Sequence, residues 1–394
     1  MNVLTFIAAK APKDLWIIII NWIQGAISNY GWTILLFTLL IKLLMSPLDF
    51  LVKLSNKKQT LIQKKCSPQV AKLKKKFGAN QEQLRIQTQA LYKREGLNMG
   101  TGCIIMLVNM IAIWAVFFTL FDSLRKVSAY EVITQYETIE QSYEGEYVRY
   151  LSEKVGDPEI DTIEEADAWY VANVEGQESS PNYVDNLKII TDANVSAGKV
   201  ACKTWNEVKE DWLWVQNIWV ADSTTAPLPT YDKLLSIAKD GGYKAYVEQN
   251  IDKNEYITIR NAVTESSSRT KNGYFLVPII VGLLTFLSQV IADLHNKLKN
   301  KKAQTLATAS GDASMGSTMK MMKIVMPVIM VLFAFSSSTS FGIYLLASSI
   351  ASIATGEVIS LIVNKMTKKQ QEEVEAVLEK EANRQIKKGK LQEK

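Results

Sequence analysis

The sequence predicts an all-α polytopic membrane protein with five transmembrane helices, a cytoplasmic helical hairpin and a mainly helical or mixed external domain. Several uncharged stretches approach the roughly 20 apolar residues that a helix needs to cross a bilayer. Charge is also segregated along the 394 residues: residues 122–271 hold 27 of the 40 acidic but only 15 of the 45 basic residues. That block is therefore net −12 and the remainder net +17. Because the lysines flank apolar stretches, they indicate a membrane surface, and no DNA partner is expected.

The N-terminal segment, residues 1–29, contains an apolar run from Leu15 to Ile27 that would be only about 20 Å long as a helix. We expect it to lie in the membrane interface, with Trp16 and Trp22 at headgroup level. The alternative is a short span that forms a hairpin with the next helix and leaves Lys10 and Lys13 in the cytoplasm.

The apolar stretches predict the five spans in order. Residues 30–52 form the first span, although they include Lys42, Pro47 and Asp49. The second, 100–122, contains 20 uncharged residues from Gly102 to Phe121, and the third, 273–293, contains 19. The 33 uncharged residues between Lys323 and Glu357 are too many for one ordinary span. The polar run at 336–340 divides them into a fourth span, 321–338, and a fifth, 339–364.

Loop charge predicts the orientation, since cytoplasmic loops are enriched in lysine and arginine. Residues 53–76 carry nine lysines and no acid, residues 297–302 carry four lysines, and the 365–394 tail is also basic. Alternating spans place these three segments on one side. We therefore expect residues 123–272 to be extracellular and the hairpin 53–99, the loop 294–320 and the tail to lie in the cytoplasm.

The parts outside the membrane give weaker signals. In the hairpin, Gly78–Asn80 predicts a turn between two helices. Its lysines are typical of a solvated linker, or of a surface for anionic headgroups, ribosomal RNA or protein partners. The tail, about 366–388, should be helical and allows the same two interpretations. In the external domain, Asp161–Val174 and Tyr231–Gln249 predict amphipathic helices.

The composition argues against an enzyme and against a bound cofactor. The chain has one histidine, His295, which removes most metal sites and histidine-based triads. Its three cysteines show no zinc spacing, and no dinucleotide, P-loop or zinc-protease motif occurs.

Lys42 is the strongest candidate functional residue. It lies about eleven residues into the first span, and a lysine near the bilayer centre costs roughly 3 kcal/mol on insertion scales. Unless the helix register places it at the interface, it must face a polar cavity. The residues that would line this cavity with it are uncharged polar side chains of the other spans: Asn109, Thr119, Gln289, Ser348, Ser349 and Ser352. Alone, each such residue more often bonds to a neighbouring helix.

The pattern resembles the YidC family of membrane protein insertases. The segments that carry the resemblance are Asn29–Trp32, Thr38–Leu48, Leu91–Cys103, Trp212–Ile218, Met322–Pro327 and Ser340–Tyr344. The resemblance as a whole covers about half of the chain, in the family's order, and implies a location in the bacterial plasma membrane. The family typically has arginine at the Lys42 position and glutamine at Asn109, and a glutamine near Glu357. Long insertions flank the Trp212–Ile218 motif, where many members have a short loop.

The resemblance implies a groove that is open to the cytoplasm and the lipid and closed on the outside, with Lys42 in it. Nascent membrane proteins would be the substrates, with the lipid bilayer as second partner. The positive charge would attract acids in the translocating tail, and hydrophobic burial would draw the apolar helix into lipid. A ribosome contact through hairpin and tail, and the Sec translocon, are further candidate partners. Two other interpretations stay open: a small-solute transporter or channel, and a membrane-anchored assembly scaffold.

Overall fold

The computed structural model describes residues 9–97, 99–300, 325 and 327–392, and these are overwhelmingly helical. Within the described part, the only β geometry is one isolated bridge between Trp212 and Val215. The all-α prediction is therefore confirmed. The chain forms two compact units: residues 1–37, 119–280 and 331–345 make the first, and residues 38–118, 281–330 and 346–394 make the second.

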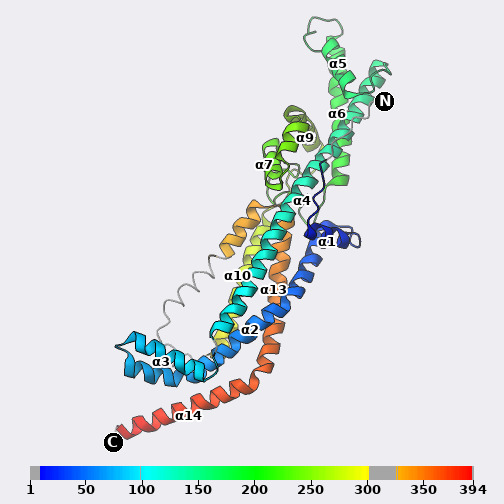
Figure 1. Cartoon of the computed structure of the whole chain (residues 1–394). Helices are drawn as coiled ribbons and strands as arrows, with labels where there is room; N and C mark the ends of the chain where they lie inside the picture. The colour runs from blue at the N-terminus through cyan, green and yellow to red at the C-terminus, as the bar shows by residue number, and fades with distance from the viewer. Residues whose placement is uncertain (1–8, 98, 301–324, 326, 393–394) are drawn as a thin grey trace. The chain divides into compact units, whose positions relative to one another are not determined.

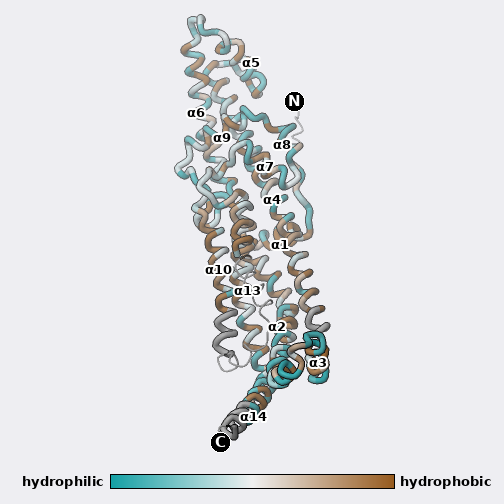
Figure 2. The backbone as a smooth tube through the Cα atoms, turned by 90° about the vertical axis from the view of Figure 1, so that its left-hand side faces the viewer, coloured by the Kyte–Doolittle hydropathy of each residue, from teal (hydrophilic) through white to brown (hydrophobic). Residues whose placement is uncertain are grey.

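Among the described residues, three helices are long and apolar enough to cross a membrane. They are α2 (Tyr30–Phe77), the apolar part of α4 (Met99–Val155) and α13 (Thr339–Met366). Figure 2 shows apolar colour along the Leu276–Ile291 part of α10 (Leu276–Asn300) and mostly hydrophilic colour on α3 (Gln81–Arg94).

Two of the expected spans are shorter as described. The helix α10 is apolar over Leu276–Ile291, and the helix before α13 covers Pro327–Ser336. Most of the predicted loop 294–320 and the first residues of the predicted fourth span lie outside the described residues. The count of five spans therefore stays a prediction.

The helix α1 (Leu15–Gln24) has ten residues, so it is about 15 Å long and reaches halfway across a hydrocarbon core. It is fixed within the first unit by Trp16, whose ring packs 5.9 Å from that of Phe37 and whose Nε1 donates a hydrogen bond to Thr119. This length favours the interfacial position over a span.

The helix α2 continues without a break from the expected first span into the expected hairpin, and ends at the turn before α3 (Figure 1). It contains Pro47 and Pro68, each of which lacks the N–H that would bond to the carbonyl four residues earlier. In both places the preceding serine compensates: Ser46 donates to Leu43 O at 2.7 Å and Ser67 donates to Lys64 O at 2.8 Å. The Ser–Pro pairs therefore leave the helix unbroken.

The helix α4 also runs through an expected boundary. We predicted that the second span ends at residue 122 and that a separate external domain begins there, but α4 continues to Val155. The sequence between Phe121 and Val155 contains no proline, and its one glycine, Gly145, lies at an exposed helical position. Nothing in that stretch terminates a helix, so α4 continues through the predicted boundary.

The rest of the external region is helical. It comprises α5 (Ile163–Asn173), α6 (Tyr183–Val208), α7 (Tyr231–Gly241), α8 (Lys244–Asn250) and α9 (Lys253–Ser266). A capping box at Thr162 and Glu165 starts α5. The single helix predicted over Tyr231–Gln249 is wrong: Gly242 adopts φ 87° and separates α7 from α8, as glycine readily does at a helix C-terminus.

The loop 210–222 joins the first unit together by capping three helices. A helix N-terminus leaves backbone N–H groups without partners. Glu210 accepts from Tyr30 N at the start of α2, at 2.6 Å, and Asp222 accepts from Val277 N at the start of α10, at 2.7 Å. The carbonyl of Val220 accepts from Thr339 N at the start of α13. One loop thus positions the ends of three membrane helices.

Candidate functional site

Lys42 is the thirteenth residue of α2 and lies about 18 Å along the helix from its start. Its neighbours Leu40, Leu43 and Leu44 are apolar and exposed, while Lys42 itself is half-buried. Within the part of the chain that the structure describes, its ammonium group makes no hydrogen bond and no ion pair. A cation without a partner in an apolar segment is costly, so it is a strong candidate for a functional group.

Lys42 begins a polar stripe on α2 that comprises Lys42, Ser46, Asp49 and Lys53. These residues are spaced by four, three and four, which places them on one helix face. Asp49 is the acid whose charge acts on Lys42, two turns away. Sequence reasoning treated Asp49 only as a sign of the helix register and Lys53 only as a loop charge. The spacing was the signal that could have identified both.

Two neighbouring helices of the second unit contact this stripe. Asn109 of α4 donates through Nδ2 to Asp49 Oδ1 at 3.4 Å, which is a long hydrogen bond. The Asn109 Oδ1 atom is buried and has no hydrogen-bond partner among the described residues. Lys53 donates to Gly356 O at 2.5 Å and to Ser360 Oγ at 3.0 Å, both on α13. The stripe therefore connects α2 to α4 and to α13.

An apolar cleft of about 410 Å³ lies beside the stripe, between α2 and α13. On α2 it is lined by Leu43, Ser46, Pro47 and Phe50. On α13 it is lined by Ala354, Thr355, Val358, Ile359 and Ile362. Ser46 belongs both to the stripe and to the cleft, so polar and apolar surfaces meet along one edge of α2.

The burial and hydrogen bonds of the other predicted site residues do not assign them to one cavity. Gln289 is half-buried on α10, and its Oε1 has no hydrogen-bond partner in the described part of the chain. On α13, Ser348 and Ser349 are half-buried and Ser352 is exposed. Thr119 belongs to the first unit, where its hydroxyl accepts the hydrogen bond from Trp16. Of the predicted set, Asn109 is the residue for which a hydrogen bond to the stripe is described, through Asp49.

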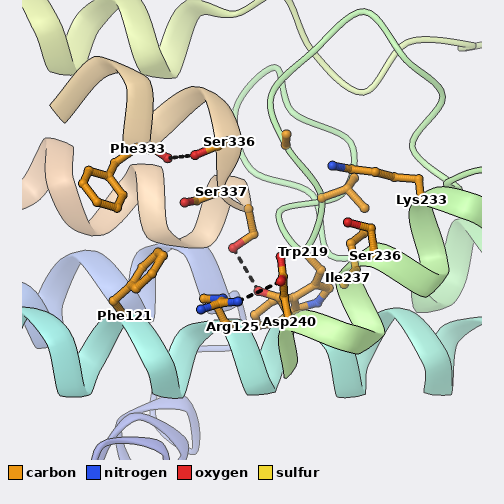
Figure 3. Close-up of a pocket in the computed structure, with 14 residues that line it drawn as sticks. Phe121, Arg125, Trp219, Lys233, Ser236, Ile237, Asp240, Phe333, Ser336 and Ser337 are labelled. Carbon is orange, nitrogen blue, oxygen red and sulfur yellow. Dashed lines mark hydrogen bonds and ion pairs between the residues drawn. The ribbon is translucent and has the colours of Figure 1, made fainter. Parts of the chain in front are cut away.

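A second cavity, of about 270 Å³, lies in the first unit (Figure 3). Arg125 of α4 and Asp240 of α7 form an ion pair at 2.9 Å beside it. The serines that end the helix Pro327–Ser336 and precede α13 line another side, and Ser128 bonds to Ser338 at 2.9 Å. The pairing of Arg125 neutralises its charge. This cavity was not predicted from the sequence.

The chain is similar to known proteins over its first third. A family model described as "60Kd inner membrane protein" matches residues 22–157. The proteins named "Membrane protein insertase YidC" from Vesicomyosocius okutanii and Chlorobium limicola are 36% and 33% identical over 107 residues. Each alignment covers 27% of this chain and 18% of the relative. The protein of that name from Caldanaerobacter subterraneus is 33% identical over 99 residues, which are 25% of this chain and 46% of the relative.

The matched part therefore spans about a fifth of the first two relatives and less than half of the third. The residues matched by the family model contain the polar stripe of α2, Asn109 and the whole of α4. No solved structure matches this chain.

Proposed function

We propose that this chain, which resembles the YidC insertases over its residues 22–157, inserts nascent membrane proteins into the lipid bilayer and assists their folding. The observation that carries the proposal is the half-buried Lys42 ammonium, which has no ion-pair partner among the described residues and stands beside an apolar cleft. A substrate that enters a membrane presents both a polar tail and an apolar helix. The polar stripe on α2 can contact the tail, and the apolar cleft beside it can contact the helix.

The proposed mechanism is physical and forms no covalent bond. The stripe and the polar groups at Asn109, Gln289, Ser348, Ser349 and Ser352 line a groove that opens to the cytoplasm and to the lipid. Lys42 attracts acids in the tail that crosses, because an ion pair in a low-dielectric setting is far stronger than in water. The apolar helix of the substrate then moves past the cleft into lipid, driven by hydrophobic burial.

The cytoplasmic side of the same proposal includes an anionic partner, and ribosomal RNA is the candidate we favour. The ion pair between Lys72 of α2 and Glu381 of α14 (Lys368–Gln392), at 2.6 Å, joins the tail to the hairpin helix. Lys75 and Lys76 at the end of α2 remain exposed. A cluster of exposed lysines favours phosphate-rich partners at low salt.

The test reconstitutes the protein in liposomes and scores protease protection of a single-span substrate with a short acidic tail. We expect Lys42→Ala to reduce insertion by about tenfold or more, in keeping with loss of one charge-assisted contact of roughly 1.5–3 kcal/mol. Lys42→Arg should retain most of the activity. Lys58→Ala is the matched control, since Lys58 is an exposed lysine on the same helix.

A substrate whose tail acids are replaced by amides should lose its dependence on Lys42. Unchanged dependence would contradict the charge pairing, and equal insertion by Lys42→Ala would make that lysine structural. If no insertion exceeds that of empty liposomes, a transporter or an assembly scaffold becomes the better proposal. A parallel sample with added Sec translocon tests whether that complex is a partner.

A further inference from the structure

Three carboxylates meet in the external region, away from the stripe on α2. Glu140 and Glu144 lie one turn apart on the same face of α4. Glu255 comes from the first turn of α9. One oxygen of each carboxylate lies within 4.8 Å of the other two. Glu140 is only 7% exposed, and the other two are half-buried.

Packing holds these carboxylates together, although their charges repel. Tyr136, one turn before Glu140, packs against Tyr256, which follows Glu255, with 4.5 Å between the ring centroids. Asp252 caps the start of α9 by accepting from Glu255 N at 3.0 Å. The aromatic contact and the cap fix Glu255 opposite α4, so the cluster is imposed by the fold.

The described part of the chain supplies no cation to this cluster. No lysine or arginine there lies within 4 Å of the three carboxylates. After burial, the strongest influences on Glu144 come from Glu255, Glu140 and Glu164, all acids. Burial raises the pKa of Glu140 to about 7, and burial together with Glu255 raises the pKa of Glu144 to about 8. The repulsion must therefore be offset by a proton shared between Glu144 and Glu255 or by a cation from outside the chain.

A further polar group points at the same place. The Tyr136 side chain is completely buried, and its hydroxyl has no hydrogen bond of regular geometry within the described residues. The hydroxyl lies beside Glu140, with which it interacts through charge and a poorly aligned hydrogen bond, and it also responds to the charge of Glu255. A buried hydroxyl whose partner is poorly aligned is incompletely satisfied, and in a native structure such a group often indicates an ion or a water that completes the site.

We propose that Glu140, Glu144 and Glu255 bind a divalent cation of the calcium class, with the Tyr136 hydroxyl completing the polar lining. Oxygen-only donors suit hard cations such as Ca²⁺, Mg²⁺ and Mn²⁺. Ca²⁺ binds oxygens at 2.3–2.6 Å, so oxygens on opposite sides of it are up to about 5 Å apart, in agreement with the spacing here. The cation joins α9 to α4 and stabilises the external region.

The test uses Tb³⁺ as a probe with the full-length protein in detergent, because Tyr136 and Tyr256 lie close enough to sensitise its luminescence. We expect a luminescence signal that Ca²⁺ removes and Na⁺ does not. Glu144→Gln, which keeps the shape of the side chain, should weaken Tb³⁺ and Ca²⁺ binding at least tenfold. Glu153→Gln is the matched control, since Glu153 is an exposed acid on the same helix.

Two results would overturn the proposal. One is Tb³⁺ binding that Ca²⁺ does not compete with, or that is equally strong in Glu144→Gln, since exposed acids would then be the ligands. The other is a melting temperature of the wild type that is the same in Ca²⁺ and in EDTA but rises on acidification, because shared protons would then neutralise the cluster. Should Glu144→Gln fail to fold, the Ca²⁺ and EDTA melting curves of the wild type and Glu153→Gln decide the matter.

Discussion

Gly31 shows how a single residue determines where the loop 210–222 packs. A Cβ atom on Gly31 would lie 2.4 Å from Cδ1 of Trp212, which is too close for any side chain. The same tryptophan packs 5.6 Å from the ring of Trp32, and Tyr30 packs 4.6 Å from Trp219. The segments around Gly31 and Trp212, both part of the family resemblance in the sequence, therefore contact each other directly.

We predict that Gly31→Ala lowers the free energy of unfolding of the detergent-solubilised protein by about 1–3 kcal/mol, because the new methyl group must displace the indole. Gly145→Ala is the control, because it should raise the free energy of unfolding. Gly145 lies in the exposed part of α4 with no atom within 4 Å of its Cβ position, so alanine should stabilise by about 0.5–1 kcal/mol. Melting curves that shift equally for the two variants would contradict the argument.

At the site, the sequence singles out a residue that is unusual in its surroundings, and it gives no signal for polar residues that are ordinary in theirs. Lys42 was recognisable because a charge in an apolar run is anomalous. Asp49 and Lys53 stand near the end of that run, where charges are ordinary, and only their contacts with Asn109 and Gly356 reveal a role. Such contacts join residues from 60 to more than 300 positions apart, and no local pattern encodes them.

At the scale of the element, helix type was predictable and helix length was not. Apolar composition identified the core of α2 and α4, but both continue well past the membrane because no residue after the apolar run stops them. The long α6 was not predicted, and neither was the capping of three helices by the loop 210–222. Capping by a distant loop depends on tertiary structure, which sequence periodicity does not report.

The Ser46–Pro47 pair allows a prediction about the α2 helix. Ser46→Ala should lower stability by about 1–3 kcal/mol, since the Leu43 carbonyl then loses its hydrogen-bond donor in an apolar segment of the helix. The double variant Ser46→Ala/Pro47→Ala should recover most of that loss, because replacing the proline restores the backbone N–H that it lacks. Thermal unfolding of both variants in detergent checks this. A double variant no more stable than Ser46→Ala would show that the serine hydroxyl has another role.

The helix α4 also predicts a pH dependence in the absence of divalent cations. Burial raises the pKa of Glu131 and Glu140 to about 7, and that of Glu144 to about 8, above the usual value of 4.5. The folded protein then binds more protons than the unfolded chain between about pH 4.5 and 8. Stability must therefore fall as pH rises through that window. Melting temperatures in EDTA should decrease from pH 5 to pH 8.

A variant separates the contributions of these acids. Glu131 precedes Glu140 by about two and a half turns of α4 and responds to Glu210, outside the three-carboxylate cluster. In Glu131→Gln the pH slope should become smaller, and the remaining slope should still respond to added Ca²⁺. In Glu144→Gln the remaining slope should be insensitive to Ca²⁺. A flat melting temperature across pH 5–8 in the wild type would refute the assignment of raised pKa values.

For the whole molecule, the segregation of charge carries the argument about orientation. The described helices hold the basic segments at the end of α2, in α3 and in α14, and the acidic residues in α4 to α9. Lysine and arginine resist translocation, whereas acidic residues contribute little to orientation. We therefore predict that the region from α5 to α9 faces the outside and that α3 faces the cytoplasm.

Cysteine labelling tests this orientation in intact cells. The three native cysteines are first replaced by serine, and single cysteines are then introduced at exposed positions, Ser179→Cys between α5 and α6 and Gln89→Cys on α3. A membrane-impermeant maleimide should label position 179 in intact cells and position 89 only after the membrane is broken. Labelling of position 89 in intact cells would reverse the orientation. It would also place the basic surface of the hairpin out of reach of ribosomes and remove that part of the proposed function.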